Sequence, residues 1–249
     1  MAPMSAAPAP TVLLTGANRG VGLALAREYA ARGWGLVATC RRPAEADDLQ
    51  ALARSNARVR IEPLDVTDTA QIAALARRLE GTAIDVLFNN AAVLGDRRDE
   101  GNRMQQLGGL DQALFAHVMM TNVYGPLKLS EALVEHVAAS RQRKIVGVTS
   151  GLGSLALMGG MSQFYYYQMS KAALNMGMRA LRNDLRGRGI VVALLAPGMV
   201  QTDLLWESGY RGKALVPDES AAGLYRLVEA LTPDDPGAPI NVDGRVLPW

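Results

Sequence analysis

The sequence contains one cysteine, Cys40, and no apolar run that approaches the roughly 20 residues needed to span a bilayer. A single thiol excludes an intrachain disulfide, which fits a reducing compartment and favours a cytoplasmic protein without a membrane partner. Residues 1–10 also lack the basic region and the long apolar core of a signal peptide. We therefore expect residues 1–10 to be a short disordered arm and residues 11–249 to form one domain.

The chain also lacks a large excess of charge of either sign. It has 26 Lys and Arg residues and 24 Asp and Glu residues, so its formal net charge is +2. No block of basic residues stands out, so we expect no nucleic-acid partner. The two histidines, His117 and His136, are isolated and form no metal-ligand cluster. We expect no metal site and interpret both histidines as surface or helix-packing residues.

Segments with strand character alternate with segments of helical character along the whole chain. The expected strands are 11–15, 36–40, 58–62, 84–88, 145–149, 190–196 and 239–242. Between them we expect helices at 23–32, 44–53, 68–79, 110–139 (bent at Gly125 and Pro126), 167–186 and 217–230. This alternation predicts an α/β fold of the Rossmann type, a doubly wound parallel sheet of about seven strands with helices on both faces. Its binding site should lie at the C-terminal ends of the strands.

A glycine-rich turn joins the first strand to the first helix. Gly16, Gly20 and Gly22 lie directly between the apolar run 11–15 and the Ala- and Leu-rich segment 23–32. Glycines permit a tight turn and a close backbone approach, and the helix N-terminus directs N–H groups and a positive dipole end at an anion. We therefore interpret this turn as a binding site for a nucleotide phosphate, and the alternative is a turn with only a structural role.

The end of the second strand indicates which nucleotide would bind. No Asp or Glu follows Cys40, whereas Arg41 and Arg42 do, and Arg19 lies inside the glycine turn. An acidic residue at this place would bind a ribose 2′-hydroxyl, and an arginine would pair with a 2′-phosphate. The pattern favours NADP over NAD, and the alternative is that Arg41 and Arg42 are ordinary surface charges.

Polar residues follow the third and fourth strands as well. Asp65 is placed to meet an adenine amino group. Asn89 is expected to brace the turns of the central strands, and Ala91 leaves room for a flat ribose or ring. Asn122 lies inside the long helical segment, where asparagine is unfavourable, so its side chain points outward or has a specific role.

The stretch from Ser150 to Lys171 carries the strongest chemical signal. Tyr167 and Lys171 are four residues apart, so in a helix their side chains share a face. A nearby ammonium would lower the pKa of the phenol and make it a proton donor or acceptor. Ser150 directly follows an expected buried strand and could hold a substrate oxygen. The alternative is a Tyr/Lys pair on a solvated helix face.

The composition of the basic residues bears on that choice. Only four of the 26 basic residues are lysines, namely Lys128, Lys144, Lys171 and Lys213. In so arginine-rich a chain, a lysine at 171 indicates a requirement for a compact ammonium.

These segments together resemble the short-chain dehydrogenase/reductase family. The turn Thr15–Gly22, the run Asn89–Ala92, the set Asn122, Ser150, Tyr167 and Lys171, and the run Pro197–Thr202 are similar to the motifs of that family in the same order. The closest similarity is to its C-factor and sniffer-like carbonyl reductases.

The resemblance implies a role for each catalytic residue. Tyr167 would donate the proton, Lys171 would lower its pKa and hold the nicotinamide ribose, Ser150 would bind the substrate oxygen, and Asn122 would anchor a water. It also implies an NADP(H) site made by Gly16, Asn18, Arg19, Gly20, Val21, Gly22, Arg41, Asp65, Val66, Asn89, Ala91, Tyr167, Lys171, Pro197, Gly198, Val200 and Thr202.

The chain departs from the family pattern in the substrate region. Ala92 and Thr149 replace a glycine and a serine, and Ser150 and Tyr167 are 17 residues apart. Ser154 is therefore a second candidate for the catalytic serine, and 203–216 is expected to be a loop that covers the substrate. The candidate substrate residues are apolar and favour a hydrophobic carbonyl compound: Val93, Leu152, Met158, Met161, Phe164, Met199 and Trp206.

We therefore hypothesise an NADPH-dependent reductase of a ketone or aldehyde that also runs as an alcohol dehydrogenase. The main alternative is a cofactor-binding signalling or regulatory protein with little turnover, against which the intact set of four catalytic residues speaks. A lyase or epimerase would have an added substrate domain, and none is visible. The resemblance also implies a homodimer formed through the helices that carry Asn122 and Tyr167.

Overall fold

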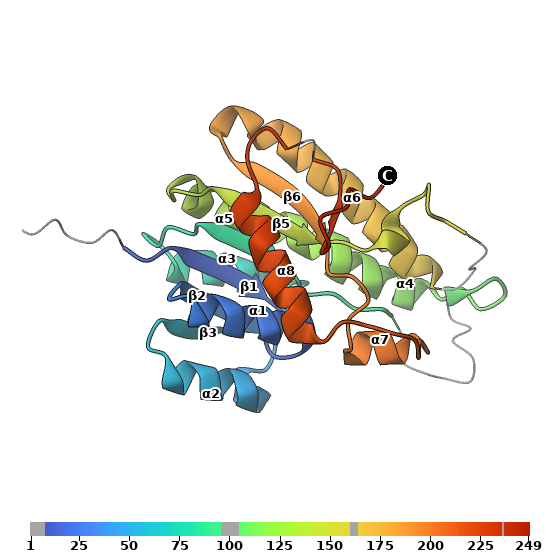
Figure 1. The fold of residues 1–249 in the computed structure, drawn as a ribbon, viewed down its shortest axis with the longest axis horizontal. Helices are drawn as coiled ribbons and strands as arrows, with labels where there is room; N and C mark the ends of the chain where they lie inside the picture. The colour runs from blue at the N-terminus through green and yellow to red at the C-terminus, as the bar shows by residue number, and fades with distance from the viewer. Residues whose placement is uncertain (1–7, 96–104, 160–163, 236) are drawn as a thin grey trace, which may run out of the picture.

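A seven-stranded sheet with strand order β3-β2-β1-β4-β5-β6-β7 forms the centre of the computed structural model, which describes residues 8–95, 105–159, 164–235 and 237–249 (Figure 1). All neighbouring strands pair in parallel. The strands are β1 (Thr11–Thr15), β2 (Gly35–Cys40), β3 (Val59–Pro63), β4 (Val86–Asn89), β5 (Lys144–Val148), β6 (Val191–Ala196) and β7 (Ile240–Asn241). The predicted doubly wound parallel sheet is confirmed.

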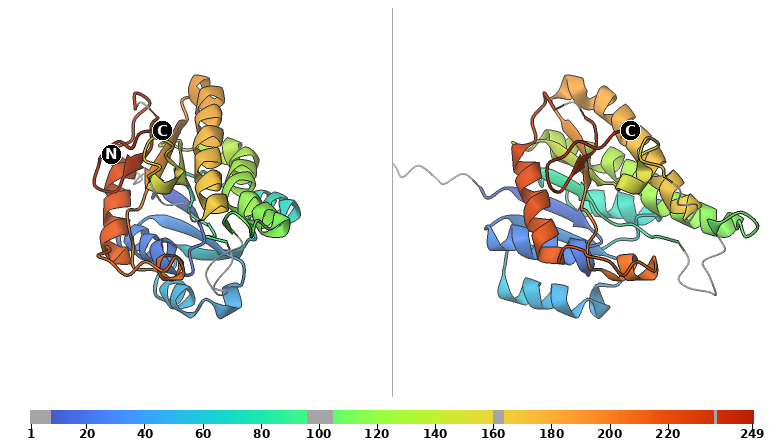
Figure 2. Two further views of the ribbon diagram at one scale, coloured as in Figure 1. Left: turned by 90° about the vertical axis from the view of Figure 1, so that its right-hand side faces the viewer. Right: turned by 45° about the vertical axis from the view of Figure 1, so that its right-hand side comes forward.

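Helices cover both faces of the sheet (Figure 2). They are α1 (Gly20–Ala31), α2 (Asp47–Ser55), α3 (Thr69–Arg78), α4 (Gln112–Met119), α5 (Gly125–Ala138), α6 (Tyr165–Leu185), α7 (Asp203–Glu207) and α8 (Pro217–Ala230). One core cluster joins α1, α2 and α8 to the sheet, and a second joins α3, α5 and α6 to the opposite face. Successive residues of β1 alternate between them, since Leu13 belongs to the second cluster and Val12 and Leu14 to the first.

The expected long helix over 110–139 consists of three pieces. A π-helical turn, Met120–Tyr124, separates α4 from α5. Gly125 follows the turn because a side chain there would lie 2.7 Å from the Val66 carbonyl oxygen. Pro126 stands in the first turn of α5, where its missing N–H is tolerated. The break therefore lies directly before Gly125 and Pro126, where a bend was expected.

Several other boundaries differ from the sequence expectation. Residues Pro43–Glu45 form a 3₁₀ turn, so α2 begins at Asp47 and not at residue 44. The segment 203–216 is not a loop throughout, because α7 begins at Asp203, where the Thr202 hydroxyl accepts a hydrogen bond from the Leu205 N–H. The last strand has only two residues. No helix among the described residues combines the length and the apolar character that a membrane crossing requires.

Candidate active site

A cleft of about 1200 Å³ opens at the C-terminal ends of the strands. It crosses the point between β1 and β4 where the strand order reverses, which is where ligands bind in such sheets. Nearly all of the predicted cofactor residues line it, namely Gly16, Asn18, Arg19, Gly20, Val21, Gly22, Arg41, Asp65, Val66, Ala91, Tyr167, Lys171, Pro197, Gly198, Val200 and Thr202. The fold thus brings together residues from five strand ends.

The glycine turn has the geometry of a phosphate cradle. Gly16 and Gly20 have φ angles of +66° and +54°, a region that L side chains rarely adopt. A Cβ at Gly22 would lie 2.1 Å from the Gly16 carbonyl oxygen, so the turn is too close to α1 for any side chain there. Arg19, the N-cap of α1, does not cap it with its side chain. First-turn N–H groups and the helix dipole therefore remain for an anion, and the turn fits a dinucleotide pyrophosphate.

Three arginines line the adenosine end of the cleft. Arg19 is paired with Asp203 at 3.0 Å, and Arg42 with Glu45 at 2.9 Å. Arg41 makes no ion pair with any residue that the structure describes. Of these three arginines, Arg41 is therefore the one whose guanidinium has no ion-pair partner among the described residues. The side chain of Asp65 also lines the cleft, and its Oδ1 accepts hydrogen bonds from the Thr67 N–H (2.9 Å) and hydroxyl (2.7 Å).

Asn90 braces the glycine turn. The sequence analysis assigned this role to Asn89, and that assignment is wrong. Asn90 Nδ2 donates to the carbonyl oxygens of Thr15 (2.9 Å) and Gly16 (3.3 Å), and its N–H donates to the Thr15 hydroxyl (3.0 Å). Asn89 is buried, donates to Ser130 Oγ at 3.2 Å and does not line the cleft. Asn89 is the last residue of β4, so consecutive asparagines point to opposite sides.

Asn122 lies in the π-helical turn, fully buried, and joins two parts of the site. Its Oδ1 accepts from the Val93 N–H at 2.9 Å, and its Nδ2 donates to the Val93 carbonyl oxygen (2.8 Å) and to Ser170 Oγ (3.0 Å). Ser170 in turn donates to the Tyr167 carbonyl oxygen at 2.7 Å. The amide therefore ties the segment after β4 to helix α6. The water-anchoring role implied by the family resemblance stays a prediction.

Tyr167 and Ser150 meet at the centre of the cleft. Both side chains line it, the Ser150 hydroxyl is near enough to the phenol to lower its pKa, and the Leu152 N–H donates to Ser150 Oγ at 3.2 Å. Burial raises the pKa of Tyr167 to about 12, and the Ser150 hydroxyl offsets part of the rise. The sequence expectation of a lowered pKa is therefore wrong for this arrangement, because desolvation of the phenolate is the largest effect on the phenol.

Lys171 lies one turn along α6 and is only 2% exposed. Its Nζ donates to the Val148 carbonyl oxygen at 2.9 Å and lies 5.5 Å from the centroid of the Tyr167 ring. Burial lowers the pKa of Lys171 to about 8. The alternative interpretation, a Tyr/Lys pair on a solvated helix face, is wrong because both side chains are buried.

The candidate substrate residues divide into two groups. Val93, Leu152, Phe164 and Met199 line the cleft. Met158 and Trp206 are partly exposed outside it, and Met161 lies outside the described residues. The cleft is also lined by residues that the sequence analysis did not place in a site, including Leu94, His117 and Thr121. Leu204 and Tyr210, which line it too, belong to the segment 203–216 that was expected to cover the substrate.

The two histidines differ in their surroundings. His117 is exposed, as expected of a surface residue, and it also lines the cleft, which the sequence analysis did not anticipate. Its spacing of four residues from Thr121 could have indicated a shared face. His136 is a packing residue as expected, with Nδ1 3.0 Å from the Thr82 carbonyl oxygen.

Ser154, the second candidate for the catalytic serine, faces away from the cleft. Its hydroxyl donates to the Trp249 carbonyl oxygen at 3.1 Å and accepts from the Leu157 N–H at 3.2 Å. It does not line the cleft. The geometry therefore favours Ser150.

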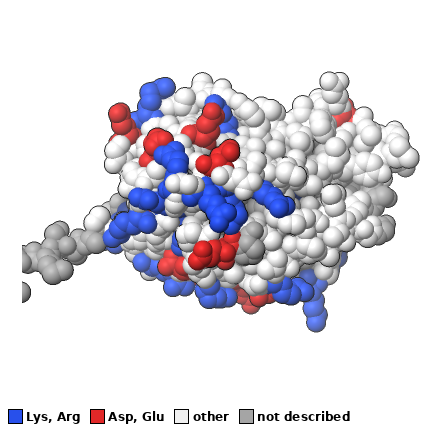
Figure 3. Space-filling model, turned by 90° about the horizontal axis from the view of Figure 1, so that it is seen from above, with Lys and Arg blue, Asp and Glu red and all other residues white. Residues whose placement is uncertain are grey.

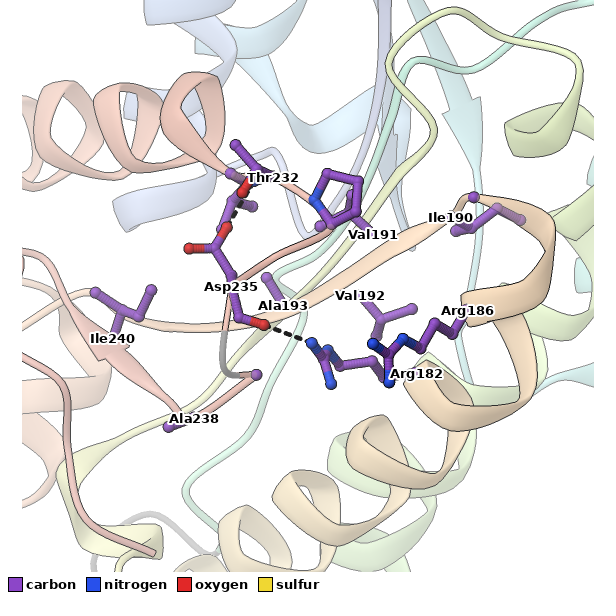
Figure 4. Close-up of a pocket in the computed structure, with 14 residues that line it drawn as sticks. Arg182, Arg186, Ile190, Val191, Val192, Ala193, Thr232, Asp235, Ala238 and Ile240 are labelled. Carbon is purple, nitrogen blue, oxygen red and sulfur yellow. Dashed lines mark hydrogen bonds between the residues drawn. The ribbon is translucent and has the colours of Figure 1, made fainter.

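A far smaller cavity, about 30 Å³, lies at the start of β6 beside the C-terminal end of α6 (Figure 4). Arg182 lines it and donates a hydrogen bond to the Asp235 carbonyl oxygen. The volume suits a water molecule or two and no substrate.

The family model described as short chain dehydrogenase matches residues 10–211. The C-signal protein of Myxococcus xanthus is 38% identical over 168 residues, which cover 67% of this chain and 93% of that protein.

Solved structures are similar over nearly the whole chain. An NADPH-bound carbonyl reductase from chicken fatty liver has a TM-score of 0.86 at 31% identity and covers 98% of this chain and 100% of its own. The carbonyl reductase Sniffer of D. melanogaster has a TM-score of 0.84 at 26% identity, with coverages of 97% and 100%. The predicted resemblance to C-factor and sniffer-like carbonyl reductases is confirmed.

Proposed function

Because the chain belongs to the short-chain dehydrogenase/reductase family and is an oxidoreductase of the carbonyl reductase type, we propose that it uses NADP(H) to interconvert a carbonyl compound and an alcohol. The observation that carries the proposal is that the Tyr167 phenol and the Ser150 hydroxyl lie together in the cleft, with the buried ammonium of Lys171 one turn away. A phenol, a hydroxyl and an ammonium around one point are what protonation of a carbonyl oxygen needs.

The cofactor and the side chains of the cleft have separate roles in the proposed reaction. The nicotinamide cofactor, held by the glycine turn and by the segment Pro197–Thr202, supplies the hydride. Ser150 orients the substrate oxygen, and Tyr167 gives it a proton. The raised pKa of Tyr167 keeps the phenol protonated at neutral pH. As the proton leaves, the hydrogen bond from Ser150 and the charge of Lys171 stabilise the phenolate that forms.

We infer a preference for NADP(H) over NAD(H). Arg41 follows β2, lines the cleft and has no ion pair with a described residue, so its charge is available to a 2′-phosphate. Arg19 would join it after giving up Asp203. An NADPH-bound carbonyl reductase of the same fold supports the inference.

We also infer a hydrophobic substrate. Apolar side chains from four separate segments, Val93, Leu152, Phe164 and Met199, line the cleft together with the Tyr167 and Ser150 hydroxyl groups. A small-molecule ketone or aldehyde with an apolar body fits such a surface.

A signalling protein that binds the cofactor with little turnover is the second candidate, favoured by the 38% identity to a protein named C-signal. A binder would not need a buried lysine beside the tyrosine, because desolvating an ammonium costs stability. The catalytic arrangement therefore favours the enzyme.

We propose, in addition, a homodimer formed through α6 and the π-helical turn, which pack side by side. Their outer surface exposes Met120 (38%), Tyr124 (41%), Met169 (50%) and Met176 (68%). In Figure 3 the charged side chains gather over one half of the face shown and leave the other half largely uncharged. An exposed apolar surface of this kind suits a second copy, and light scattering after size exclusion tests the mass.

The decisive experiment follows NADPH oxidation optically over a panel of apolar ketones and aldehydes, with the wild type beside Tyr167→Phe and with NADH in parallel. We expect wild-type turnover and a loss of about 10²–10⁴-fold in the variant, with NADPH still bound. Tight NADPH binding without wild-type turnover would favour the signalling protein instead. Faster turnover with NADH would contradict the cofactor preference alone.

A further inference from the structure

Gln105 lies in a segment without an assigned role and is completely buried. Its side-chain Nε2 donates to the carbonyl oxygen of Leu94 at 3.0 Å, and its Oε1 accepts from the N–H of Tyr167 at 3.3 Å. Leu94 follows β4 at the edge of the cleft, and Tyr167 carries the reacting phenol. One amide therefore bridges two walls of the active site that are distant in the sequence.

The helix that carries Tyr167 needs such a partner. The first N–H groups of a helix have no intrahelical acceptor, and the N–H of Tyr167 is the third in α6. Phe164, the N-cap, has no side-chain oxygen and adopts a left-handed conformation with φ of +58°. Gln105 thus acts as an N-cap that reaches α6 from 62 residues away.

The packing around the amide leaves it little freedom. Gly95 has φ of +126°, and a Cβ there would lie 2.2 Å from Gln105 Nε2. Leu94, Phe164 and Tyr167 form one buried apolar cluster beside it. An amide that is enclosed in this way and hydrogen-bonded at both ends fixes the distance between the groups it joins.

We propose that Gln105 is a positioning residue for the reaction, one that holds the first turn of α6 so that the Tyr167 hydroxyl stays against Ser150. It touches neither substrate nor cofactor in this role and acts through the Tyr167 main chain. The phenol is attached to the very residue whose N–H is held, so a small shift of the turn moves the proton donor directly. Misplacement of a reacting group by about 1 Å costs about 10²-fold in rate. The rate consequence rests on the proposed function.

The test compares Gln105→Leu, which keeps the volume and loses both hydrogen bonds, with Gln142→Leu at the opposite end of the sheet, beside the start of β5. We expect Gln105→Leu to lower kcat for NADPH-dependent carbonyl reduction about tenfold or more, with the Kd for NADPH within about twofold. Gln142→Leu should leave both unchanged. A purely structural role would lower stability without this separation of kcat from Kd.

Gln105→Glu gives a readout in pH. A carboxylate still accepts from the Tyr167 N–H but repels the Leu94 carbonyl oxygen, whereas the protonated acid restores both bonds. Burial raises the pKa of such a carboxyl, so the ratio of its kcat to that of the wild type should rise as pH falls from 8 to 6. A ratio that does not change with pH would overturn the proposed bridge to Leu94.

Hydrogen–deuterium exchange tests, without any measurement of turnover, whether Gln105 holds the first turn of α6. In Gln105→Leu the amides of residues 165–168 should exchange about tenfold faster, while those of α8 keep the wild-type rate. Unchanged exchange would overturn the proposal, and so would faster exchange with wild-type kcat. If the wild type reduces no carbonyl compound, the proposed function fails, and the exchange rates still decide whether Gln105 holds α6.

Discussion

Lys171 Nζ on α6 donates a hydrogen bond of 2.9 Å to the carbonyl oxygen of Val148, the last residue of β5. Ser150 follows Val148 by two residues, so this bond joins the helix of the proton donor to the strand end that presents the serine. The ammonium is held there at the cost of its hydration, since it is 2% exposed. Function and stability therefore compete at this lysine, and the competition can be measured.

Lys171→Met should stabilise the protein at pH 7. Burial lowers the pKa of Lys171 from 10.5 to about 8. The folded chain then binds a proton less tightly than the unfolded chain, so stability is lost below pH 8 and returns as pH rises from about 8 to 10.5. The shift corresponds to about 3 kcal/mol, and the lost hydrogen bond offsets about 1 kcal/mol.

Urea unfolding at pH 7 and pH 10.5 measures this effect. We expect a gain of roughly 2 kcal/mol at pH 7 that shrinks or disappears at pH 10.5, together with a loss of turnover. A variant that is less stable than the wild type at both pH values would contradict the assignment.

The pH profile of carbonyl reduction should follow the charge of Lys171. Reduction needs a protonated Tyr167 and an ammonium that stabilises the phenolate left behind. The pKa of Tyr167 is about 12, so its proton is not limiting at neutral pH, whereas Lys171 loses its charge near pH 8. We expect kcat to be constant below about pH 8 and to fall as pH rises further. A profile that stays flat to pH 10 would contradict this role of the ammonium.

Gly22→Ala should damage the fold and the cofactor site together. The new methyl group would lie 2.1 Å from the Gly16 carbonyl oxygen and 2.7 Å from Asn90 Nδ2. Overpacking of this kind costs about 1–3 kcal/mol, and it displaces the turn that cradles the phosphates. Calorimetry and NADPH titration measure the two effects. Gly187→Ala is the matched control, because a Cβ there meets nothing within 4 Å.

Two charge variants separate the arginines of the adenosine end. Arg41→Ala should weaken NADPH binding about 10–100-fold, the loss of a charge-assisted hydrogen bond worth about 1.5–3 kcal/mol, and leave NADH binding unchanged. Asp203→Asn frees Arg19 from an exposed ion pair worth about 0.2–1 kcal/mol, so NADPH should bind roughly 1.5- to 5-fold more tightly. Equal effects of Arg41→Ala on both cofactors would refute the assignment of Arg41 to the 2′-phosphate.

Ser150→Ala and Ser154→Ala should behave differently. Ser150 lies near Tyr167 in the cleft, and loss of such a donor costs about 10²–10³-fold in kcat. Ser154 is bonded to the Trp249 carbonyl oxygen, so its replacement should leave kcat close to that of the wild type. Steady-state kinetics of both variants with one substrate decide between them. The reverse order would assign the catalytic role to Ser154.

The architecture could be predicted from the sequence because its signals are local. Apolar runs bounded by turn residues marked the strands, and α8 occupies 217–230 as expected. The boundaries of α2 and of the helix over 110–139 were missed, because contacts decide them. Gly125, for example, follows the π-helical turn where the chain approaches the Val66 carbonyl oxygen.

For the site, the sequence by itself determined which groups are present: the glycine turn, the arginines after β2 and the spacing of Tyr167 and Lys171. Only the tertiary structure decided what surrounds them. Burial set the direction of the Tyr167 pKa, against the sequence expectation, and a strand that ends one residue later than expected gave the bracing role to Asn90. The role of Gln105 could not be predicted from the sequence, because desolvation and hydrogen bonding depend on neighbours that lie far apart in the chain.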